Sequence, residues 1–272
     1  MVLWFLTTSP FFAQQRILVF ANGYLGPDKD QIPRNNGVTS IPQSYWYAYD
    51  DTLIHRLKPM KTLYVSGHHP MSTSSHRTKW RFGLSWLFTK VLWFRCKSGF
   101  GLNMRPNPEG FQTRVDNGKT CGQNLLHFVR DSLPKIHSGD TLDIVCHSMG
   151  YAYVLGILHE VDTIFHLGKI LIISPESPQT MGYDWNRFEE VWQYGSNLGE
   201  KKADFIVFQD GIAPQGPVKN LDQLLPGKGG RVFLPKKTVH GKTPRGTVWS
   251  HHLSKFQWFY TVRPGDYGYF TR

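Results

Sequence analysis

The chain has 272 residues, which is the length of one large domain or two small ones. Its apolar content of 40% and aromatic content of 14% exclude a disordered chain. No apolar run approaches the roughly 18 residues that a membrane-spanning helix needs. The 31 Lys and Arg residues against 20 Asp and Glu residues give a net charge of +11, which predicts a polyanionic partner such as nucleic acid, anionic lipid or an acidic glycan. The three cysteines show neither a disulfide framework nor the spacing of zinc ligands (Cys96, Cys121 and Cys146).

Residues 1–15 join a short apolar stretch to a small residue at Ala13, as the apolar and cleavage parts of a secretory signal do. No Lys or Arg precedes the apolar stretch, and Phe11 is bulky where such signals carry a small residue. Two interpretations follow. In one, the segment is a signal peptide cut after Ala13 and the protein is secreted or periplasmic. In the other, it is an N-terminal arm packed on the domain of a cytoplasmic protein.

Residues 16–272 show short apolar strands alternating with helices, as a single domain would. We expect strands over 16–21, 62–66, 141–146, 169–174, 203–209 and 231–234, and helices over 120–136, 151–160 and 254–262. Buried strands separated by helices predict an α/β fold, with a mostly parallel central sheet flanked by helices on both faces.

The most informative stretch surrounds Ser148. A buried apolar strand leads directly into His147-Ser148-Met149-Gly150 and then into a helix. This order of strand, tight turn and helix is the context of a nucleophile elbow, and the N-terminus of the helix directs backbone N–H groups at the turn. Cys146 stands where the motif Gly-x-Ser-x-Gly has its first glycine.

On this elbow the chain resembles the α/β-hydrolase superfamily, and more closely its lipase and esterase branch, from residue 16 to residue 262. The resemblance implies an oxyanion loop after the first strand, where Asn-Gly-Tyr-Leu-Gly occupies positions 22–26 with Asn22 in place of the family's histidine. It also implies that the backbone N–H groups of Tyr24 and Met149 form the oxyanion hole. Such a donor is worth roughly 3 kcal/mol in the transition state.

The chain order of the family is serine, acid, histidine, and it places the acid at Asp210. That residue follows the second strand expected after the elbow. The carboxylate would hold the tautomer of the catalytic imidazole and stabilise the imidazolium. Glu176 and Asp184 follow the preceding strand and are the alternatives.

The family's histidine lies on a loop just before the last helix, which favours His251 as the general base. His252 is the close alternative, and His240 lies near the last expected strand. Three further histidines precede the serine and do not fit this order, so we expect them to line a loop or the cleft (His68, His69 and His76). Few carboxylates lie near them in the sequence, so we expect no metal site.

These residues predict a serine hydrolase that cleaves an ester, with lipid-like acyl esters favoured, through an acyl-enzyme on Ser148 and without a cofactor. The alternative is a catalytically silent protein of the same fold that binds an anionic membrane or another partner through a basic, aromatic insertion.

That insertion covers about residues 68–110, which is long for a connection between elements. It carries an apolar stripe at helical spacing (Trp80, Leu84, Leu87, Val91 and Phe94) among Lys and Arg residues. The stripe fits either a lid-like helix at a lipid interface or a buried insertion helix. Residues 52–108 hold ten Lys and Arg and no acid, which leaves 21 bases and 20 acids elsewhere. The expected polyanion is therefore a lipid surface or an anionic substrate, and nucleic acid is disfavoured.

Overall fold

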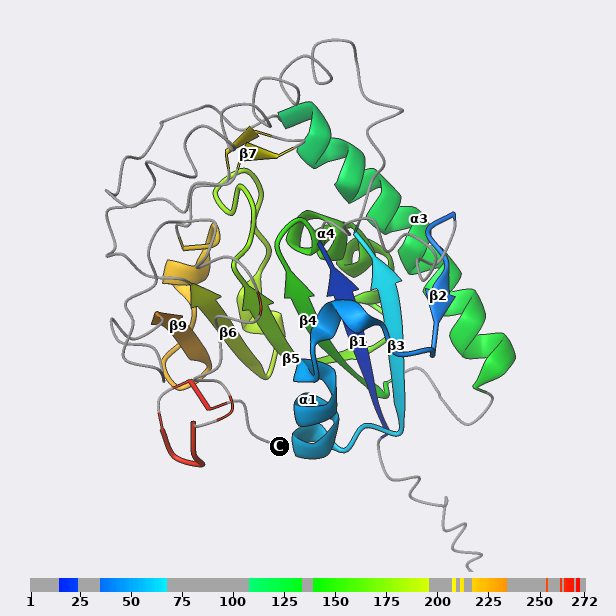
Figure 1. The fold of residues 1–272 in the computed structure, drawn as a ribbon, viewed down its shortest axis with the longest axis horizontal. Helices are drawn as coiled ribbons and strands as arrows, with labels where there is room; N and C mark the ends of the chain where they lie inside the picture. The colour runs from blue at the N-terminus through cyan, green and yellow to red at the C-terminus, as the bar shows by residue number, and fades with distance from the viewer. Residues whose placement is uncertain are drawn as a thin grey trace, which may run out of the picture.

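A computed structural model describes residues 15–23, 35–67, 108–133, 139–195, 207–208, 211–212, 217–233, 253, 260, 262–266 and 268–269. Seven strands form one sheet: β1 (Arg16–Asn22), β2 (Val38–Thr39), β3 (Lys61–Ser66), β4 (Thr141–His147), β5 (His166–Ile173), β6 (Glu190–Gly195) and β9 (Gly229–Phe233). Their order is β2-β3-β1-β4-β5-β6-β9 (Figure 1). Neighbouring strands pair in parallel, except that β2 runs antiparallel to β3. The mostly parallel α/β sheet predicted from the sequence is confirmed.

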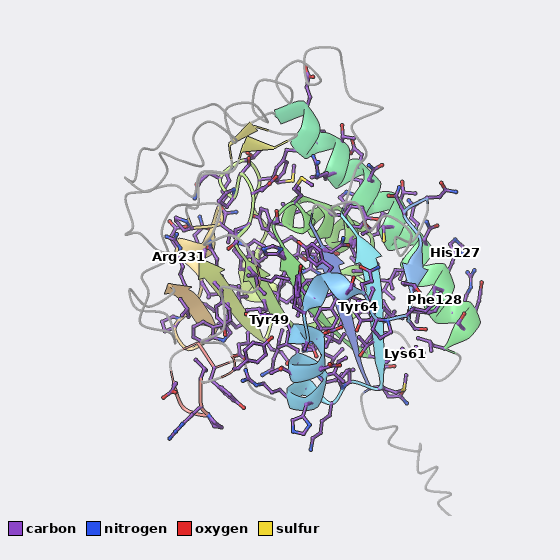
Figure 2. The ribbon with its side chains drawn as sticks, in the orientation of Figure 1. Tyr49, Lys61, Tyr64, His127, Phe128 and Arg231 are labelled. Atoms are coloured by element: carbon purple, nitrogen blue, oxygen red, sulfur yellow. The ribbon has the colours of Figure 1, made fainter. Side chains whose placement is uncertain are left out.

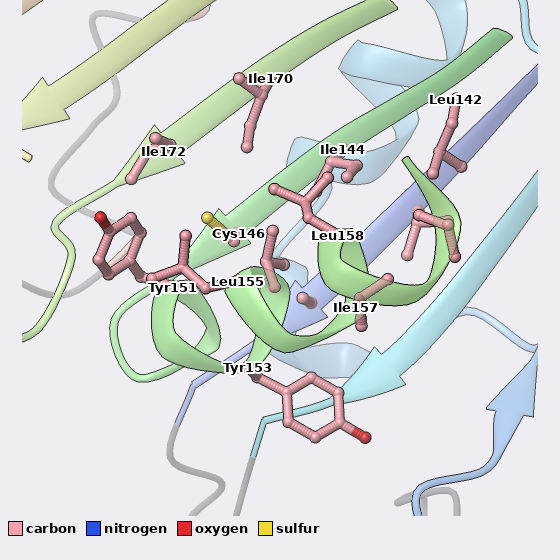
Figure 3. Close-up of a cluster of buried hydrophobic side chains, with 14 of the residues drawn as sticks. Leu142, Ile144, Cys146, Tyr151, Tyr153, Leu155, Ile157, Leu158, Ile170 and Ile172 are labelled. Carbon is pink, nitrogen blue, oxygen red and sulfur yellow. The ribbon is translucent and has the colours of Figure 1, made fainter. Parts of the chain in front are cut away.

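Both faces of this sheet are buried, because its central strands are apolar at nearly every position. In β1, Ile17 and Val19 join the core on the side of α3 (Pro108–Ser132) and α4 (Gly150–Val161), whereas Leu18 and Phe20 join the core on the side of α1 (Tyr49–Leu57). This alternation follows from the two-residue period of a strand. Figure 1 shows α1 on the near face of the sheet and α4 behind it. Figure 2 labels Tyr49 and Tyr64, which belong to the core on the side of α1. Figure 3 shows the residues of α4 packed on β4 and β5.

Helices α3 and α4 cross with their backbones in direct contact. A Cβ on Gly118 would lie 2.0 Å from the carbonyl oxygen of Tyr153, and a Cβ on Gly156 would lie 1.9 Å from that of Val115. The residues of α3 that face this core recur at spacings of four and three, with glycine at two of the positions (Phe111, Val115, Gly118, Gly122, Leu125 and Val129). The helix expected over 120–136 therefore begins earlier, at Pro108, because the glycines belong to its packed stripe.

Other differences from the sequence expectation lie in strands of mixed composition. The fifth parallel strand is β6, where Gln193 is buried and accepts a hydrogen bond from the N–H of Val218 at 2.8 Å. Of the strand expected over 203–209, the structure describes only β7 (Val207–Phe208), which pairs antiparallel with β8 (Gly211–Ile212) in a separate two-stranded sheet. The two-residue β2 and the nine-residue α1 were not expected at all. The short helices η2 (Ser44–Trp46), η5 (Trp185–Arg187) and η6 (Leu221–Gln223) complete the described elements.

Several expectations fall outside the described residues. They are the signal or arm at 1–14, almost all of the insertion (68–107) and most of the closing helix at 254–262. Cys121 and Cys146 are buried and carry free thiols. No helix within the described ranges combines the length and the apolar character that crossing a bilayer requires.

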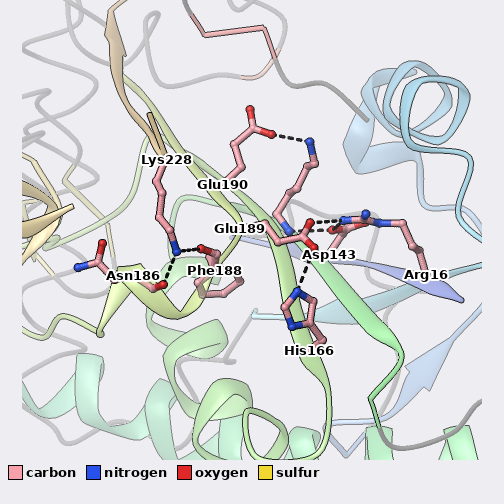
Figure 4. Close-up of polar contacts among 9 residues, drawn as sticks. Arg16, Asp143, His166, Asn186, Phe188, Glu189, Glu190 and Lys228 are labelled. Carbon is pink, nitrogen blue, oxygen red and sulfur yellow. Dashed lines mark hydrogen bonds and ion pairs between the residues drawn. The ribbon is translucent and has the colours of Figure 1, made fainter. Parts of the chain in front are cut away.

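A network of charges lies at the amino-terminal edge of the sheet (Figure 4). Arg16 donates two hydrogen bonds to the carboxylate of Asp143, from Nε at 2.9 Å and from Nη2 at 2.8 Å, and its Nη2 also donates to Glu189 at 3.0 Å. The Asp143 side chain is fully buried and also accepts the N–H of Lys169 at 2.7 Å. The hydrogen bond from Arg16 to Asp143 raises the pKa of the guanidinium. The guanidinium therefore stays charged, and it compensates the buried carboxylate.

Replacing Gly118 with alanine should force α3 away from α4. We expect the free energy of unfolding to fall by about 1–3 kcal/mol, since a methyl group has no space beside the carbonyl of Tyr153. Gly122→Ala is the comparison, because the atoms nearest to its added Cβ are farther away, the Cβ and Cγ of Glu160 at 2.8 and 3.0 Å and the carbonyl oxygen of Ile157 at 3.1 Å, so it should lose less. Urea denaturation measures both. A Gly118→Ala protein as stable as the wild type would contradict the close crossing.

Arg16→Met should leave the carboxylate of Asp143 buried without its cation. The expected loss is roughly 3 kcal/mol of unfolding free energy, measured by urea denaturation. Arg130→Met removes an arginine whose side chain is 69% exposed in its pair with Asp131, and should change stability by less than about 1 kcal/mol. Equal effects of the two substitutions would show that the Arg16 pair does not stabilise the sheet edge.

Candidate active site

The direction in which the chain crosses the sheet reverses between β1 and β4. After β1 the chain continues to β2 and β3 on one side, whereas after β4 it continues to β5 on the other side. Loops that leave neighbouring parallel strands in opposite directions open a crevice, and open α/β sheets bind their ligands there. The strands end at Asn22 and His147, so the residues that follow them, Gly23 and Ser148, lie at this point.

Ser148 forms the turn between β4 and α4, as the sequence predicts. Its backbone is in the left-handed conformation with φ of 60°, which is unfavourable for a residue with a Cβ. Three hydrogen bonds hold it there: its N–H donates to the carbonyl of Ile173 at 3.0 Å, and its own carbonyl accepts the N–H groups of Tyr151 and Glu176, each at 3.2 Å. The turn is therefore fixed by the neighbouring strand as well as by the helix that follows it.

The end of β1 touches this turn directly. A Cβ added to Gly23 would lie 2.6 Å from the Cβ of Ser148 and 3.0 Å from its Oγ. A Cβ added to Gly150 would lie 2.4 Å from the carbonyl oxygen of Ala21. Glycine at these two positions is what allows the elbow to pack against the end of β1. The structure thus places the start of the expected oxyanion loop beside Ser148, while Tyr24 itself lies outside the described residues.

Met149 begins the helix on the other side of the serine. It is buried, with helical backbone angles, at the N-terminus of α4. Within the described part of the chain, its backbone N–H donates to no acceptor. The first N–H groups of a helix have no partner inside the helix, so they are available to a ligand, and the helix dipole favours negative charge at this end. This fits the role that the resemblance implies for Met149.

Polar side chains are buried around the turn, which is unusual for the interior of a domain. Asn22 and Ser174 are fully buried at the carboxyl ends of β1 and β5. Among the described residues, neither the Oδ1 atom of Asn22 nor the Oγ atom of Ser174 has a hydrogen-bond partner. Ser174 also has a left-handed backbone, with φ of 44°. Unpaired buried polar atoms and backbone strain are both costly, and both concentrate at binding and catalytic sites.

Sequence reasoning missed Tyr45, which lies on η2. Its phenol oxygen accepts the backbone N–H of Gly23 at 3.1 Å and forms a hydrogen bond with Nδ1 of His147. Burial raises the pKa of Tyr45, so the phenol stays protonated. Tyr45 is one of three consecutive aromatic residues far from the elbow in sequence, and nothing in that local pattern distinguishes a contact at the site from ordinary core packing.

Of the two candidate carboxylates that the structure describes, Glu176 and Asp184, it is Glu176 that lies at Ser148. It is buried, and its backbone N–H is bonded to the serine carbonyl. Asp184, in contrast, is exposed, and its carboxylate accepts the N–H of Asn186 at 3.2 Å as the cap of η5. Asp210 falls between β7 and β8 in sequence and lies outside the described residues. Among the described elements, the second strand of the main sheet after the elbow is β6, which ends at Gly195.

The structure therefore brings together Ser148, Met149 and Glu176 from the residues that the sequence singled out. The histidines proposed as base, and those upstream of the serine, lie outside the described residues (His240, His251, His252, His68, His69 and His76). In the ranges that the structure describes, no group of three or more His, Cys, Asp or Glu residues is arranged to hold a metal ion.

Comparison of the chain with models of known protein families finds no match, and a comparison with curated proteins finds no similar sequence. The fold and the residues of the site are therefore the basis on which a function is proposed.

Proposed function

We propose that the protein is a serine hydrolase of the α/β-hydrolase type that cleaves an ester, with lipid-like acyl esters favoured. The observation that carries this proposal is the geometry of Ser148. A serine in a strained turn, at the carboxyl end of a parallel strand and at the N-terminus of a helix, lies against the end of the neighbouring strand. A structural turn has no need of this strain, since asparagine or glycine adopts the left-handed conformation more readily. A nucleophile benefits from it, because its hydroxyl is held at a fixed place.

In the proposed reaction, Oγ of Ser148 attacks the ester carbonyl as a general base, His251, takes its proton. The carbonyl oxygen becomes an oxyanion, stabilised by the N–H groups of Met149 and Tyr24. The tetrahedral intermediate collapses to an acyl-enzyme as the imidazolium protonates the leaving alcohol. Water activated by the same imidazole then attacks the acyl-enzyme, which releases the acid and restores the hydroxyl of Ser148.

Two carboxylates are candidates for the partner of the imidazole. Asp210 is in the chain order that the family resemblance implies. Glu176 is supported by its burial and by its backbone hydrogen bond to Ser148. Either would hold the imidazole in its productive tautomer and stabilise its charged form.

The preference for lipid-like substrates rests on the basic, aromatic insertion, and the same insertion would contact an anionic membrane surface. Its seven Lys and Arg residues, which form most of the acid-free basic stretch 52–108, would favour an anionic lipid surface or an anionic substrate at the entrance of the site. Export as a secreted or periplasmic protein is part of the same proposal, on the pattern of residues 1–15.

A fluorophosphonate probe tests the nucleophile directly, since it modifies activated serines. The wild-type protein should be labelled and Ser148→Ala should not, as read by intact-protein mass spectrometry. Ser177→Ala is a matched control, because Ser177 is also buried with a left-handed backbone at this edge and should not affect labelling. A folded wild-type protein that remains unlabelled in the presence of detergent or lipid would overturn the proposed activity.

The acid and the base are identified by four substitutions measured for turnover of a chromogenic ester. His251→Ala and the substitution of the true acid, Asp210→Asn or Glu176→Gln, should each lower kcat by about 10³-fold or more. His252→Ala and the other carboxylate variant should keep kcat within a few fold of the wild type. Activity that survives His251→Ala and disappears in His252→Ala would reassign the base. If Asp210→Asn and Glu176→Gln each keep the activity of the wild type, neither carboxylate is the acid.

A further inference from the structure

We infer that Tyr45 is a positioning residue that fixes the start of the oxyanion loop against the nucleophile elbow. The inference rests on the proposed function, and it assigns a role to a residue outside the expected triad and oxyanion hole. Its basis is a bridge of two hydrogen bonds, from Gly23 to the phenol oxygen and from the phenol to His147.

The direction of the first hydrogen bond follows from the atoms involved. The backbone N–H of Gly23 can only donate, so the phenol oxygen of Tyr45 is its acceptor. The phenol oxygen can accept a second hydrogen bond or donate its one proton, and its other partner within the described ranges is Nδ1 of His147. We assign the proton of this second bond to Tyr45, so that the phenol donates to Nδ1 and the neutral imidazole of His147 carries its proton on Nε2.

This bridge joins residues that flank the reacting groups. His147 immediately precedes Ser148, and Gly23 immediately precedes Tyr24, the proposed second oxyanion donor. Because the N–H of Gly23 is bonded to the phenol oxygen, it is not available to an oxyanion. Close contact between Gly23 and Ser148 means that a small movement of this loop changes the distance between donor and nucleophile. A misplacement of about 1 Å can lower a rate by as much as about 10²-fold.

The surroundings of Tyr45 keep it in place. Its neighbour Trp46 is fully buried, with its ring centroid 4.9 Å from that of Phe20 on β1. Directly after this anchor, Tyr47 and Ala48 both have left-handed backbones, with φ of 50° and 66°. Each costs about 1–2 kcal/mol in a residue with a Cβ, so the surrounding contacts must compensate for this strained connection. The strain lies at the point where the chain turns from η2 into α1.

Tyr45→Phe removes the bridging oxygen and keeps the ring. For turnover of the ester we expect a fall in kcat of about 10- to 100-fold with KM within twofold, because substrate binding is intact and the oxyanion donor is misplaced. Tyr183→Phe is the matched control. It removes a phenol that donates to Asp162 at 2.6 Å, away from the elbow, and should leave kcat unchanged. A loss of packing alone would lower the unfolding midpoint without this separation of kcat from KM.

A second measurement on the wild-type protein does not depend on any variant being folded or active. Proton–nitrogen correlation spectra of the ¹⁵N-labelled histidine rings, with His147 assigned by comparison with His147→Gln, should show a neutral ring protonated on Nε2 and accepting at Nδ1. A ring protonated on Nδ1 overturns the assigned position of the proton, and an Nδ1 atom that shows no hydrogen bond overturns the bridge.

The outcomes separate this inference from the proposed function. Labelling of Ser148 that is lost in Ser148→Ala, together with slow turnover by Tyr45→Phe, supports both. Labelling that persists at an unchanged rate in a folded Tyr45→Phe protein, with unchanged kcat, overturns the role of Tyr45 and leaves the hydrolase proposal standing. A wild-type protein that is not labelled overturns the hydrolase proposal, and with it any catalytic role of Tyr45, even where the spectra show the bridge.

Discussion

Contact between the end of β1 and the turn after β4 is the constraint on which the site depends. Parallel pairing of the two strands brings their carboxyl ends to the same level, with Ala21 opposite Cys146. That pairing alone would leave the two loops separated by side chains. Glycine at positions 23 and 150 removes those side chains, so the backbone of one loop rests on the serine of the other. The sheet, α4 and the start of the first loop are thus joined at one point, and a shift in any of them moves Ser148.

The two ends of the central strands serve different purposes. At the amino-terminal edge, the buried carboxylate of Asp143 is paired with a bidentate arginine and a backbone N–H, so its hydrogen-bonding capacity is used within the protein. At the carboxyl edge, described polar atoms are buried without such partners, as at Asn22 and Ser174. The first edge stabilises the fold through satisfied charges. The second retains hydrogen-bonding groups that a bound molecule or ordered water can use, as a binding site requires.

Local patterns in the sequence predicted those parts of the fold that local interactions determine. The apolar strands β1, β3, β4 and β5, the helix α4 and the turn at Ser148 were all expected close to their observed bounds, because each is an unbroken apolar run or a strand–turn–helix motif. The strand β6 was missed because its sequence mixes polar and apolar residues, and because the N–H of Val218 that donates to the buried Gln193 is 25 residues away in the sequence. The early part of α3 was missed because a glycine such as Gly118 is unfavourable in an isolated helix. In the structure its lack of a side chain allows α3 to pack directly against the backbone of α4. Tyr45 belongs to the same class, since its role depends on two residues that are far from it in sequence.

The left-handed backbone of Ser148 makes serine a less favourable residue than glycine for this turn. A glycine at this position would adopt the same angles without the clash of a Cβ, and the three backbone hydrogen bonds of the turn involve no side-chain atom. The left-handed backbone at position 148 is therefore more favourable for glycine than for serine. The Cβ atom of a serine in this conformation costs about 1–2 kcal/mol relative to glycine. The proposed role of Ser148 as a nucleophile accounts for a residue that is less favourable than glycine in its own turn.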